Sequence, residues 1–474
     1  MRVTGRPTDD AEAVMAQEDP VVVVGMGVEA PGGISGAGAY WKALFDGRSL
    51  MEPLPRDRGW DVDGLFALPR THGWGPVPDS GGFLHGAAEF DPGFFGISPK
   101  ETPALDAQQR VALRVAWAAL EQAGVDPAAL REANMSASPG VADGSAPGTS
   151  GFSTRGGVFM GASPTGYGAP VDRPDPELSG HWITGVVMAS VAGRISHLLG
   201  LDGPSMAVDA ACASSITAVN EAINSLRLGQ CEWAIAGGVC VMGSAGPYVE
   251  FSRDRALDPS GYCRPYSASA AGTVWGEGAA IVVLERRSRA EQLGHRVLAE
   301  IVASGVNHNG AGAPMTMPSQ AAQERLYRMV LDRAGLVPHQ VTVVEGHGTG
   351  TAVGDPREAR AVAAVYGNRE GSVSRTEPLS LGSVKSNLGH AQAAAGALGL
   401  VKIILAGVHG MVPPTLHADP PSLEVDWDAV GIQVPTRPVR WRGVGGRRIG
   451  AVSSFGVAGT NAHLIVEIPE NEGD

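Results

Sequence analysis

The sequence predicts an α/β protein with a layered, mostly parallel sheet and helices on its faces. Apolar segments of strand length alternate with amphipathic segments of helix length from residue 21 to residue 467. The chain contains 66 glycines but only 5% aromatic residues, a composition that suits closely packed layers. Its 474 residues exceed the usual size of one domain, but two α/β halves can fuse into a single body.

Each expected element follows from a local pattern. Strands are expected where short apolar runs are bounded by turn residues, at 21–25, 205–208, 233–241, 278–285, 297–306, 449–453 and 462–467. Helices are expected at 105–124, with Asp106 as the cap and Gly124 at the end, and at 215–223, 320–334 and 357–366. Residues 132–155 are rich in Gly, Ser, Ala and Pro without periodicity, which predicts a mobile surface loop.

Composition argues against several classes of function. The net charge of −13 argues against nucleic-acid binding. No segment reaches the run of about 18 apolar residues that a transmembrane helix needs, and residues 1–19 do not resemble a signal peptide. We therefore expect a flexible N-terminal extension, no membrane contact and a cytoplasmic location. The cysteines at 212, 231, 240 and 263 lack Cys-x-x-Cys spacing, so neither a metal site nor a disulfide is expected.

The most informative segment surrounds Cys212. A β-prone run ends at Val208 and an apolar-periodic helix begins near Ser215, so the cysteine lies at a strand-to-helix turn. The unpaired N–H groups of a helix end stabilise the thiolate, which is the nucleophilic form. We expect them to lower the thiol pKa by about one unit. The alternative for a lone cysteine is a small buried core residue.

Two histidines follow strands farther along the chain. His347 lies in a Gly-His-Gly-Thr-Gly-Thr segment after an apolar run that ends at Glu345. His390 lies in Asn-Leu-Gly-His, before a long helix of small residues. Open α/β sheets place their chemistry at the carboxyl ends of strands. One such histidine is commonly structural, but two of them together with a cysteine turn indicate a catalytic set.

These residue types suit acyl-transfer chemistry. Cysteine takes an acyl group as a thioester, and neutral histidines can donate N–H bonds to a thioester oxygen that becomes an enolate. A helix N-terminus is expected to lower the pKa of His390 and keep the ring neutral. Lys385 is expected to orient His390 or tune its charge, the alternative being an ordinary surface lysine.

The motifs resemble those of the β-ketoacyl synthases, specifically the ketosynthase domains of bacterial modular type I polyketide synthases. The resemblance extends over about residues 19–468. Besides the cysteine and histidine motifs, it rests on FDPGFFGISP at 90–99, WGEG at 275–278, SSFG at 453–456 and GTNAH at 459–463.

The resemblance implies a thiolase fold, with two pseudo-twofold-related halves in a five-layer α-β-α-β-α sandwich. The halves would span 20–285 and 286–468, followed by a tail at 469–474. It also implies a homodimer without a bound cofactor. Substrates would arrive on the phosphopantetheine of an acyl carrier protein.

The resemblance also assigns roles to residues. Cys212 would be the acyl nucleophile, His347 and His390 would promote decarboxylation and condensation, and Lys385 would support His390. The backbone N–H groups of Cys212 and Phe455 would form the oxyanion hole. The positions carried over as pocket residues are Ala210, Ala213, Thr349, Thr351, Asn387 and Gly456.

The chain also departs from the family pattern. Residues 132–155 look like an insertion, and Val186, Ala210, Ala213 and Gly346 replace the usual Asn, Thr, Ser and Ala. Seven residues follow Glu467, so we expect a discrete enzyme that meets its carrier in trans. The segment at 437–448, with five arginines, is a candidate docking patch; a solvated surface is the alternative.

Three functions stay open at this point. The default is a decarboxylative Claisen condensation between the Cys212-bound chain and a malonyl-type thioester. The discrete form and the altered pocket positions favour an alternative, intramolecular cyclisation by aldol reaction or lactonising release without a malonyl donor. A non-catalytic scaffolding subunit is a distant third, because the nucleophile is retained.

Overall fold

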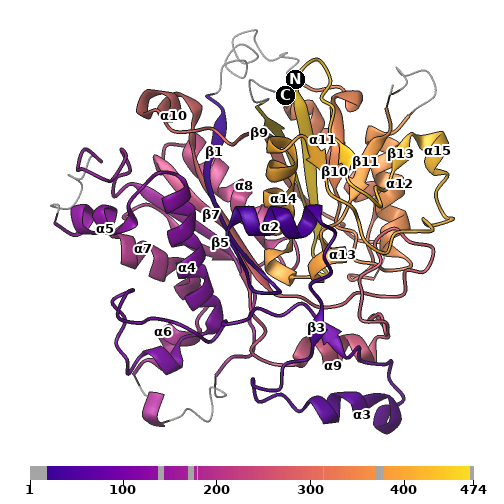
Figure 1. The fold of residues 1–474 in the computed structure, drawn as a ribbon, viewed down its shortest axis with the longest axis horizontal. Helices are drawn as coiled ribbons and strands as arrows, with labels where there is room; N and C mark the ends of the chain where they lie inside the picture. Colours follow the sequence, from indigo (N-terminus) through magenta and orange to yellow (C-terminus); the bar gives the residue numbers. More distant parts are fainter. Residues whose placement is uncertain are drawn as a thin grey trace, which may run out of the picture.

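Five layers of helices and sheet make up the protein. The computed structural model describes residues 19–136, 144–168, 176–178, 180–312, 314–368, 375 and 377–469. Across the view of Figure 1, one helical layer lies at each side, one lies in the centre, and sheet separates them. The predicted α/β class and five-layer thiolase architecture are confirmed.

The strands of the first half follow a defined order of pairing. β1 (Val21–Ala30) pairs antiparallel with β8 (Gly278–Arg286), and β8 pairs antiparallel with β7 (Trp233–Cys240). β7 is parallel to β5 (Gly156–Gly161), which is parallel to the edge strand β6 (Ser205–Val208).

The second half repeats this order. β9 (Ala299–His308), β16 (Thr460–Ile468) and β15 (Arg448–Phe455) are antiparallel neighbours. β15 is parallel to β10 (Val341–Glu345), and β10 is parallel to β11 (Leu379–Gly382). Antiparallel pairing of β1 with β9 joins the two halves into one 12-stranded sheet. The expectation of a mostly parallel sheet is therefore wrong, because antiparallel pairs fill the middle of the whole sheet and parallel pairs lie toward its two edges.

Helices of the two halves also correspond. The outer layers contain α4 (Ala107–Gln122) with α7 (Ala189–Leu199), and α11 (Gln320–Arg333) with α12 (Gly354–Tyr366). The central layer contains α8 (Ser214–Arg227) and α14 (Ala395–Val408), which contact each other. Asp106 caps α4 by accepting a bond from the Gln108 N–H at 2.9 Å, as the sequence predicted.

Shorter elements cover the ends of the layers. The helices are α2 (Ala37–Phe45), α3 (Val62–His72), α5 (Pro127–Ser136), α6 (Trp182–Val186), α9 (Gly246–Arg253), α10 (Arg287–Leu293), α13 (Lys385–Leu388) and α15 (Trp427–Val430). The short strands are β2 (Ile34–Ser35), β3 (Glu52–Pro53), β4 (Ser80–Gly81), β12 (Met411–Val412), β13 (Ile432–Gln433) and β14 (Val439–Arg440). Each helix in the described part of the chain is too short or too polar to cross a bilayer.

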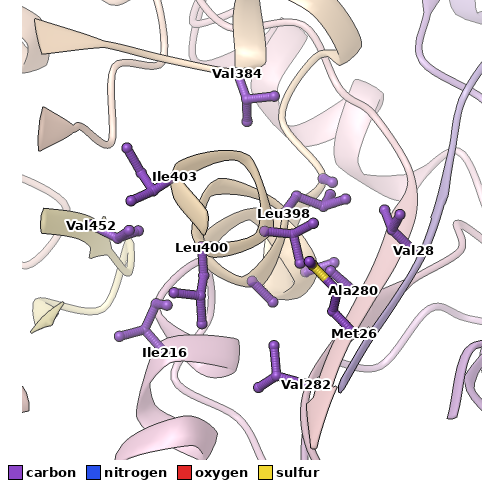
Figure 2. Packing of buried hydrophobic residues seen from close by; sticks show 14 of the residues in the cluster. Met26, Val28, Ile216, Ala280, Val282, Val384, Leu398, Leu400, Ile403 and Val452 are labelled. Carbon is purple, nitrogen blue, oxygen red and sulfur yellow. The ribbon is translucent and has the colours of Figure 1, made fainter. Parts of the chain in front are cut away.

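Helix α14 is enclosed on every side. All its residues from Ala395 to Gly407 are buried, which fits a helix that is apolar around its whole circumference. Figure 2 shows its side chains among residues of β1, β8, α8 and β15, namely Met26, Val28, Ala280, Val282, Ile216 and Val452. A Cβ at Gly396 would lie 2.4 Å from Ile216 Cγ1, so α14 lacks a side chain where the Ile216 side chain of α8 packs against it.

The loop expected at 132–155 is more ordered than predicted at both ends. α5 extends to Ser136, and Phe152 is fully buried, stacked on His295 with ring centroids 5.1 Å apart. His295 bonds Glu285 through Nδ1 and donates to the Ser150 carbonyl at 2.7 Å. Burial alone would lower the pKa of His295, but these two acceptors raise it. Residues 137–143 of the predicted insertion lie outside the described residues.

The terminal predictions fall mainly outside the described residues as well. Residues 1–18 and 470–474 are not described, and Asp19 bonds the backbone N–H of Ser288 at 2.9 Å. The exact division of the halves at 285/286 stays a prediction.

A buried ion pair ties α14 to the second half of the sheet. Lys402 Nζ lies 2.6 Å from Glu345 Oε2, and the side chains are 2% and 3% exposed. We expect Lys402→Met to lower the free energy of unfolding by about 3–5 kcal/mol, because it leaves a buried carboxylate unpaired. Urea unfolding measures this, and the additional change Glu345→Gln should restore most of the loss.

Lys42→Met is the matched control for this prediction. Lys42 pairs with Asp46 at 2.6 Å, but its side chain is 76% exposed, so little stability should change. Equal unfolding midpoints for Lys402→Met and the wild type would contradict the prediction.

Candidate active site

Cys212 lies in a braced turn between β6 and α8. The predicted strand at 205–208 is confirmed, and the helix begins at Ser214. Ser214 Oγ accepts from the Ala210 N–H at 2.9 Å and donates to the Ala211 carbonyl at 2.5 Å. Ala211 has a φ of 53°, an unfavourable conformation for a residue with a side chain. Ser454 Oγ donates to the Cys212 carbonyl at 2.6 Å, which holds the turn against β15.

Two buried carboxylates hold the loop that carries His347. Glu358 accepts the backbone N–H groups of His347 and Gly348 at 2.6 and 2.8 Å. Asp355 accepts the N–H groups of the next three residues, 349–351, at 3.0–3.2 Å. Burial raises the pKa of Asp355 to about 6 and that of Glu358 to about 7. The loop geometry therefore depends on α12, which supplies both carboxylates.

His390 is fixed by backbone contacts with the segment at 274–276. Its N–H donates to the Val274 carbonyl at 2.7 Å, and its carbonyl accepts from Gly276 at 3.0 Å. The ring lies beside Trp275, with centroids 5.4 Å apart. A one-turn 3-10 helix at Gln392–Ala394 separates His390 from α14.

The two imidazole rings lie edge to face and have the same pattern of bonds at Nδ1. Their centroids lie 5.3 Å apart at an interplanar angle of 83°. His347 Nδ1 accepts from the Phe455 N–H at 3.4 Å, and His390 Nδ1 accepts from the Gln392 N–H at 3.1 Å. An Nδ1 that accepts a bond places the proton of a neutral ring on Nε2. Both rings therefore present an Nε2–H donor.

Electrostatics keep both histidines neutral. Burial, then the charge of Lys385, holds the pKa of His347 well below its ordinary value, and the nearby His390 adds to this. The same two causes lower the pKa of His390. The direction predicted for His390 is confirmed, but the cause is burial more than a helix end.

Lys385 is not a surface lysine. It is 3% exposed, at the start of α13. Burial lowers its pKa, while Glu345 and Glu358 oppose that shift. Its charge lowers the pKa of both histidines, whereas the sequence predicted an effect on His390 alone.

The pKa of the Cys212 thiol differs from the prediction. Burial raises its pKa to about 11, although Lys385 and the backbone N–H groups of Val457 and Cys212 act in the opposite direction. The predicted lowering by a helix end is therefore wrong, because removing the thiolate from water outweighs the dipole.

A cavity of about 310 Å³ connects these groups with solvent. Of the residues predicted for the site, Cys212, both histidines, Thr349, Thr351, Phe455 and Gly456 line it. Val353 and Val457 also line it and are 50% and 47% exposed, so they lie toward its mouth.

The protein also has a second cavity, of about 210 Å³. Cys240, Gln392 and Ala393 line it together with Gln108 and Ser163. Gln392 and Ala393 directly follow the His390–Ala391 segment, so the second cavity is close to the first in the fold.

Several predicted site residues have structural roles instead. Asn387 is 1% exposed and donates to the Arg48 carbonyl at 3.0 Å, so it anchors a distant segment and lines neither cavity. Ala210 and Ala213 also line neither cavity; Ala213 belongs to the hydrophobic core, and Ala210 packs against it.

The contacts of Phe455 do not favour its predicted role as an oxyanion donor. Its N–H is directed at His347 Nδ1, whereas the Val457 N–H lies at the Cys212 thiol. A Cβ at Gly456 would lie 2.3 Å from the Ala210 carbonyl oxygen, so this tight contact sets the turn that presents Val457.

Sequence reasoning missed a polar wall of the cavity. This wall includes Asn309, which directly follows β9, Gln323 of α11 and Asn461 of β16. The GTNAH motif contains Asn461 and was a usable signal, whereas Gln323 looks like any polar residue of an amphipathic helix.

The substitution at Gly346 also has a structural reason. A Cβ at this position would lie 2.0 Å from Tyr266 Oη, and that hydroxyl donates to Glu358 at 3.0 Å. The glycine thus makes room for a tyrosine that helps to hold the His347 loop.

Comparison with known proteins identifies the family. Residues 18–290 match the β-ketoacyl synthase N-terminal domain, and residues 298–419 match the β-ketoacyl synthase C-terminal domain. The fold is similar to the oxazolomycin ketosynthase domain OzmH KS7 of Streptomyces albus JA3453, with a TM-score of 0.83 and 35% identity. That match covers 96% of this chain and 76% of the other. The ketosynthase from module 6 of the bacillaene synthase of Bacillus subtilis 168 gives a TM-score of 0.82 at 31% identity, covering 96% and 73%.

Curated relatives are much longer than this chain. Mycoketide-CoA synthase of Mycobacterium tuberculosis is 45% identical over 457 residues, which are 95% of this chain and 10% of that protein. Polyketide synthase GfsB of Streptomyces halstedii is 45% identical over 454 residues, or 96% and 8% of the two chains. The two domain matches and these similarities show that the chain belongs to the β-ketoacyl synthase family.

Proposed function

We propose that the protein is a polyketide ketosynthase that extends an acyl chain bound to Cys212 by decarboxylative condensation. The observation that supports this most is the pair of neutral imidazoles, which present Nε2–H donors in the cavity that Cys212 also lines. Two neutral donors suit an oxygen that gains negative charge during the reaction, because they stabilise it without transferring a proton first.

The first step is transfer of the acyl group from a carrier thioester. The sulfur of Cys212 attacks the thioester carbonyl, the bond to the carrier sulfur breaks, and the carrier thiol leaves with the proton. We assign the oxyanion hole of this step to the backbone N–H groups of Cys212 and Val457. A donor of this kind contributes about 2.7–4 kcal/mol to the transition state.

The second step forms the carbon–carbon bond. A malonyl-type thioester loses carbon dioxide, and the enolate oxygen accepts bonds from His347 and His390. The enolate carbon then attacks the Cys212 thioester, whose carbon–sulfur bond breaks and restores the thiolate. Burial, together with the charge of Lys385, keeps both rings neutral and therefore available as donors.

The partners belong to the same proposal. We propose that an acyl carrier protein presents both substrates on phosphopantetheine, without a cofactor bound to this chain; its supply in trans stays a prediction. The arginines at 437–448 are a poor docking patch, because Arg442 and Arg447 pair with glutamates and Arg448 is 5% exposed.

We also propose a homodimer through the edge of the first half-sheet. β6 pairs only with β5 in the described chain, and Met206 on it is 40% exposed. An edge strand with unpaired backbone groups favours pairing with a second copy.

The nucleophile is tested by intact-mass analysis of the acylated protein. An acyl adduct should form with an acyl-carrier donor and disappear in Cys212→Ala. Turnover of this adduct should require a malonyl-carrier. An adduct in Cys212→Ala would contradict the assignment, and a cyclic or released product without the malonyl donor would favour cyclisation instead.

The two histidines should separate loading from bond formation. His347→Ala and His390→Ala should still acquire the acyl group, more slowly, because the backbone donors remain. They should lose condensation by about 10²–10⁴-fold, as expected for a positioned catalytic group. Lys385→Ala should resemble His390→Ala. Single-turnover assays measure both steps, and complete failure to load would show that a histidine activates the thiol.

The raised thiol pKa predicts the pH dependence of alkylation. The thiolate reacts with iodoacetamide, so below a pKa of about 11 the rate at Cys212 should rise about tenfold per pH unit from 7 to 9. Mass spectrometry of the labelled peptide measures this, with Cys212→Ala as the control. A rate that levels off below pH 8 would show a thiolate already formed at neutral pH.

A further inference from the structure

Gln323 is a buried amide without a hydrogen-bond partner. It lies on α11, is 0% exposed and lines the cavity that contains Cys212. Neither its Nε2 nor its Oε1 finds a partner in the described part of the chain. A buried amide that bonds nothing is unfavourable, so its presence needs a physical reason.

The other amides of this wall are paired. Asn461 donates to the side-chain oxygens of Asn307 and Asn309 at 3.0 and 2.9 Å. Asn309 donates in turn to the Met317 carbonyl at 3.3 Å. Trp275 Nε1 is also unpaired among the described residues, but it is only a donor. Gln323 is therefore the group in this wall that offers a free donor together with a free acceptor.

Because Gln323 lines the cavity that leads to Cys212, the part of a substrate that it contacts can be inferred. The half-exposed Val353 and Val457 line this cavity together with Cys212 and the buried Gln323. A thioester that reaches the thiol from solvent must extend through this cavity. In the proposed function, the part of the substrate that lies between the protein surface and the sulfur is the phosphopantetheine arm, which carries two amides.

The electrostatics favour a neutral polar ligand here. His347 and His390 are held neutral, and the carboxylates of Asp355 and Glu358 accept backbone N–H groups. An amide of the arm has an N–H and a carbonyl, which match the acceptor and donor that Gln323 leaves unused.

We infer that Gln323 is a positioning residue that hydrogen-bonds an amide of the phosphopantetheine arm and so places the thioester at Cys212. This inference rests on the proposed function. The free protein thus keeps an unpaired amide that only the substrate satisfies, an arrangement that gives specificity at the expense of stability.

The first test compares stability with a matched paired glutamine. Gln323→Met should raise the thermal unfolding midpoint, because it removes an unpaired buried amide at similar volume. Gln109 is the control: it is 1% exposed, donates to the Gly185 carbonyl at 2.7 Å and accepts from Arg194. Gln109→Met should lower the midpoint. A similar fall for Gln323→Met would overturn the inference.

The second test uses thioesters that differ only in the arm. The same acyl group is supplied as the pantetheine thioester, with two amides, and as the S-ethyl thioester, with none. Gln323→Met should lower kcat/KM for Cys212 acylation by about 5- to 50-fold with the first donor, the effect of losing one or two hydrogen bonds. With the S-ethyl thioester the rate should stay within about twofold of wild type.

The outcomes separate the inference from the proposed function. Equal losses with both donors, or no loss with either, overturn the role of Gln323 while wild-type acylation still supports the ketosynthase. A wild-type protein that takes no acyl group from either thioester overturns the proposed function and the inference together.

Discussion

Helix α14 is apolar around its whole circumference, so it is stable only when protein encloses it on every side. This requirement explains the sandwich: one half-sheet and α8 cover part of the helix, and the other half-sheet covers the rest. The one lysine in the helix, Lys402, is tolerated because Glu345 at the end of β10 pairs with it. The same enclosure brings His390, which precedes the helix, beside the turn that follows β6.

Burial also sets the protonation states of Cys212, His347 and His390. Desolvation disfavours every charged form, so it keeps both imidazoles neutral and the thiol protonated. Lys385 strengthens the first effect and opposes the second. The charge of Lys385 therefore lowers the pKa of three groups from different parts of the chain: Cys212, His347 and His390. Backbone N–H groups then fix which nitrogen of each ring carries the proton.

Buried carboxylates and closely packed glycines hold the loops of the site in place. Asp355 and Glu358 accept bonds from five consecutive backbone N–H groups, those of residues 347–351. Glycines at 346 and 456 permit contacts that a side chain would block. Against this well-paired background, the unpaired amide of Gln323 is conspicuous, and a substrate that supplies its partners accounts for it.

The sequence by itself determined the types of the main elements and most of the catalytic set. Asp106 as a cap, the strand before Cys212 and the loops of His347 and His390 are local features, and local patterns encode them. Only the tertiary structure decided the mixed pairing of the sheet and the raised pKa of Cys212. It also decided that the Val457 N–H lies at the thiol and that Asn387 donates to the Arg48 carbonyl. These properties depend on desolvation and on contacts between segments that lie far apart in the chain, and no local pattern of residues records either of them.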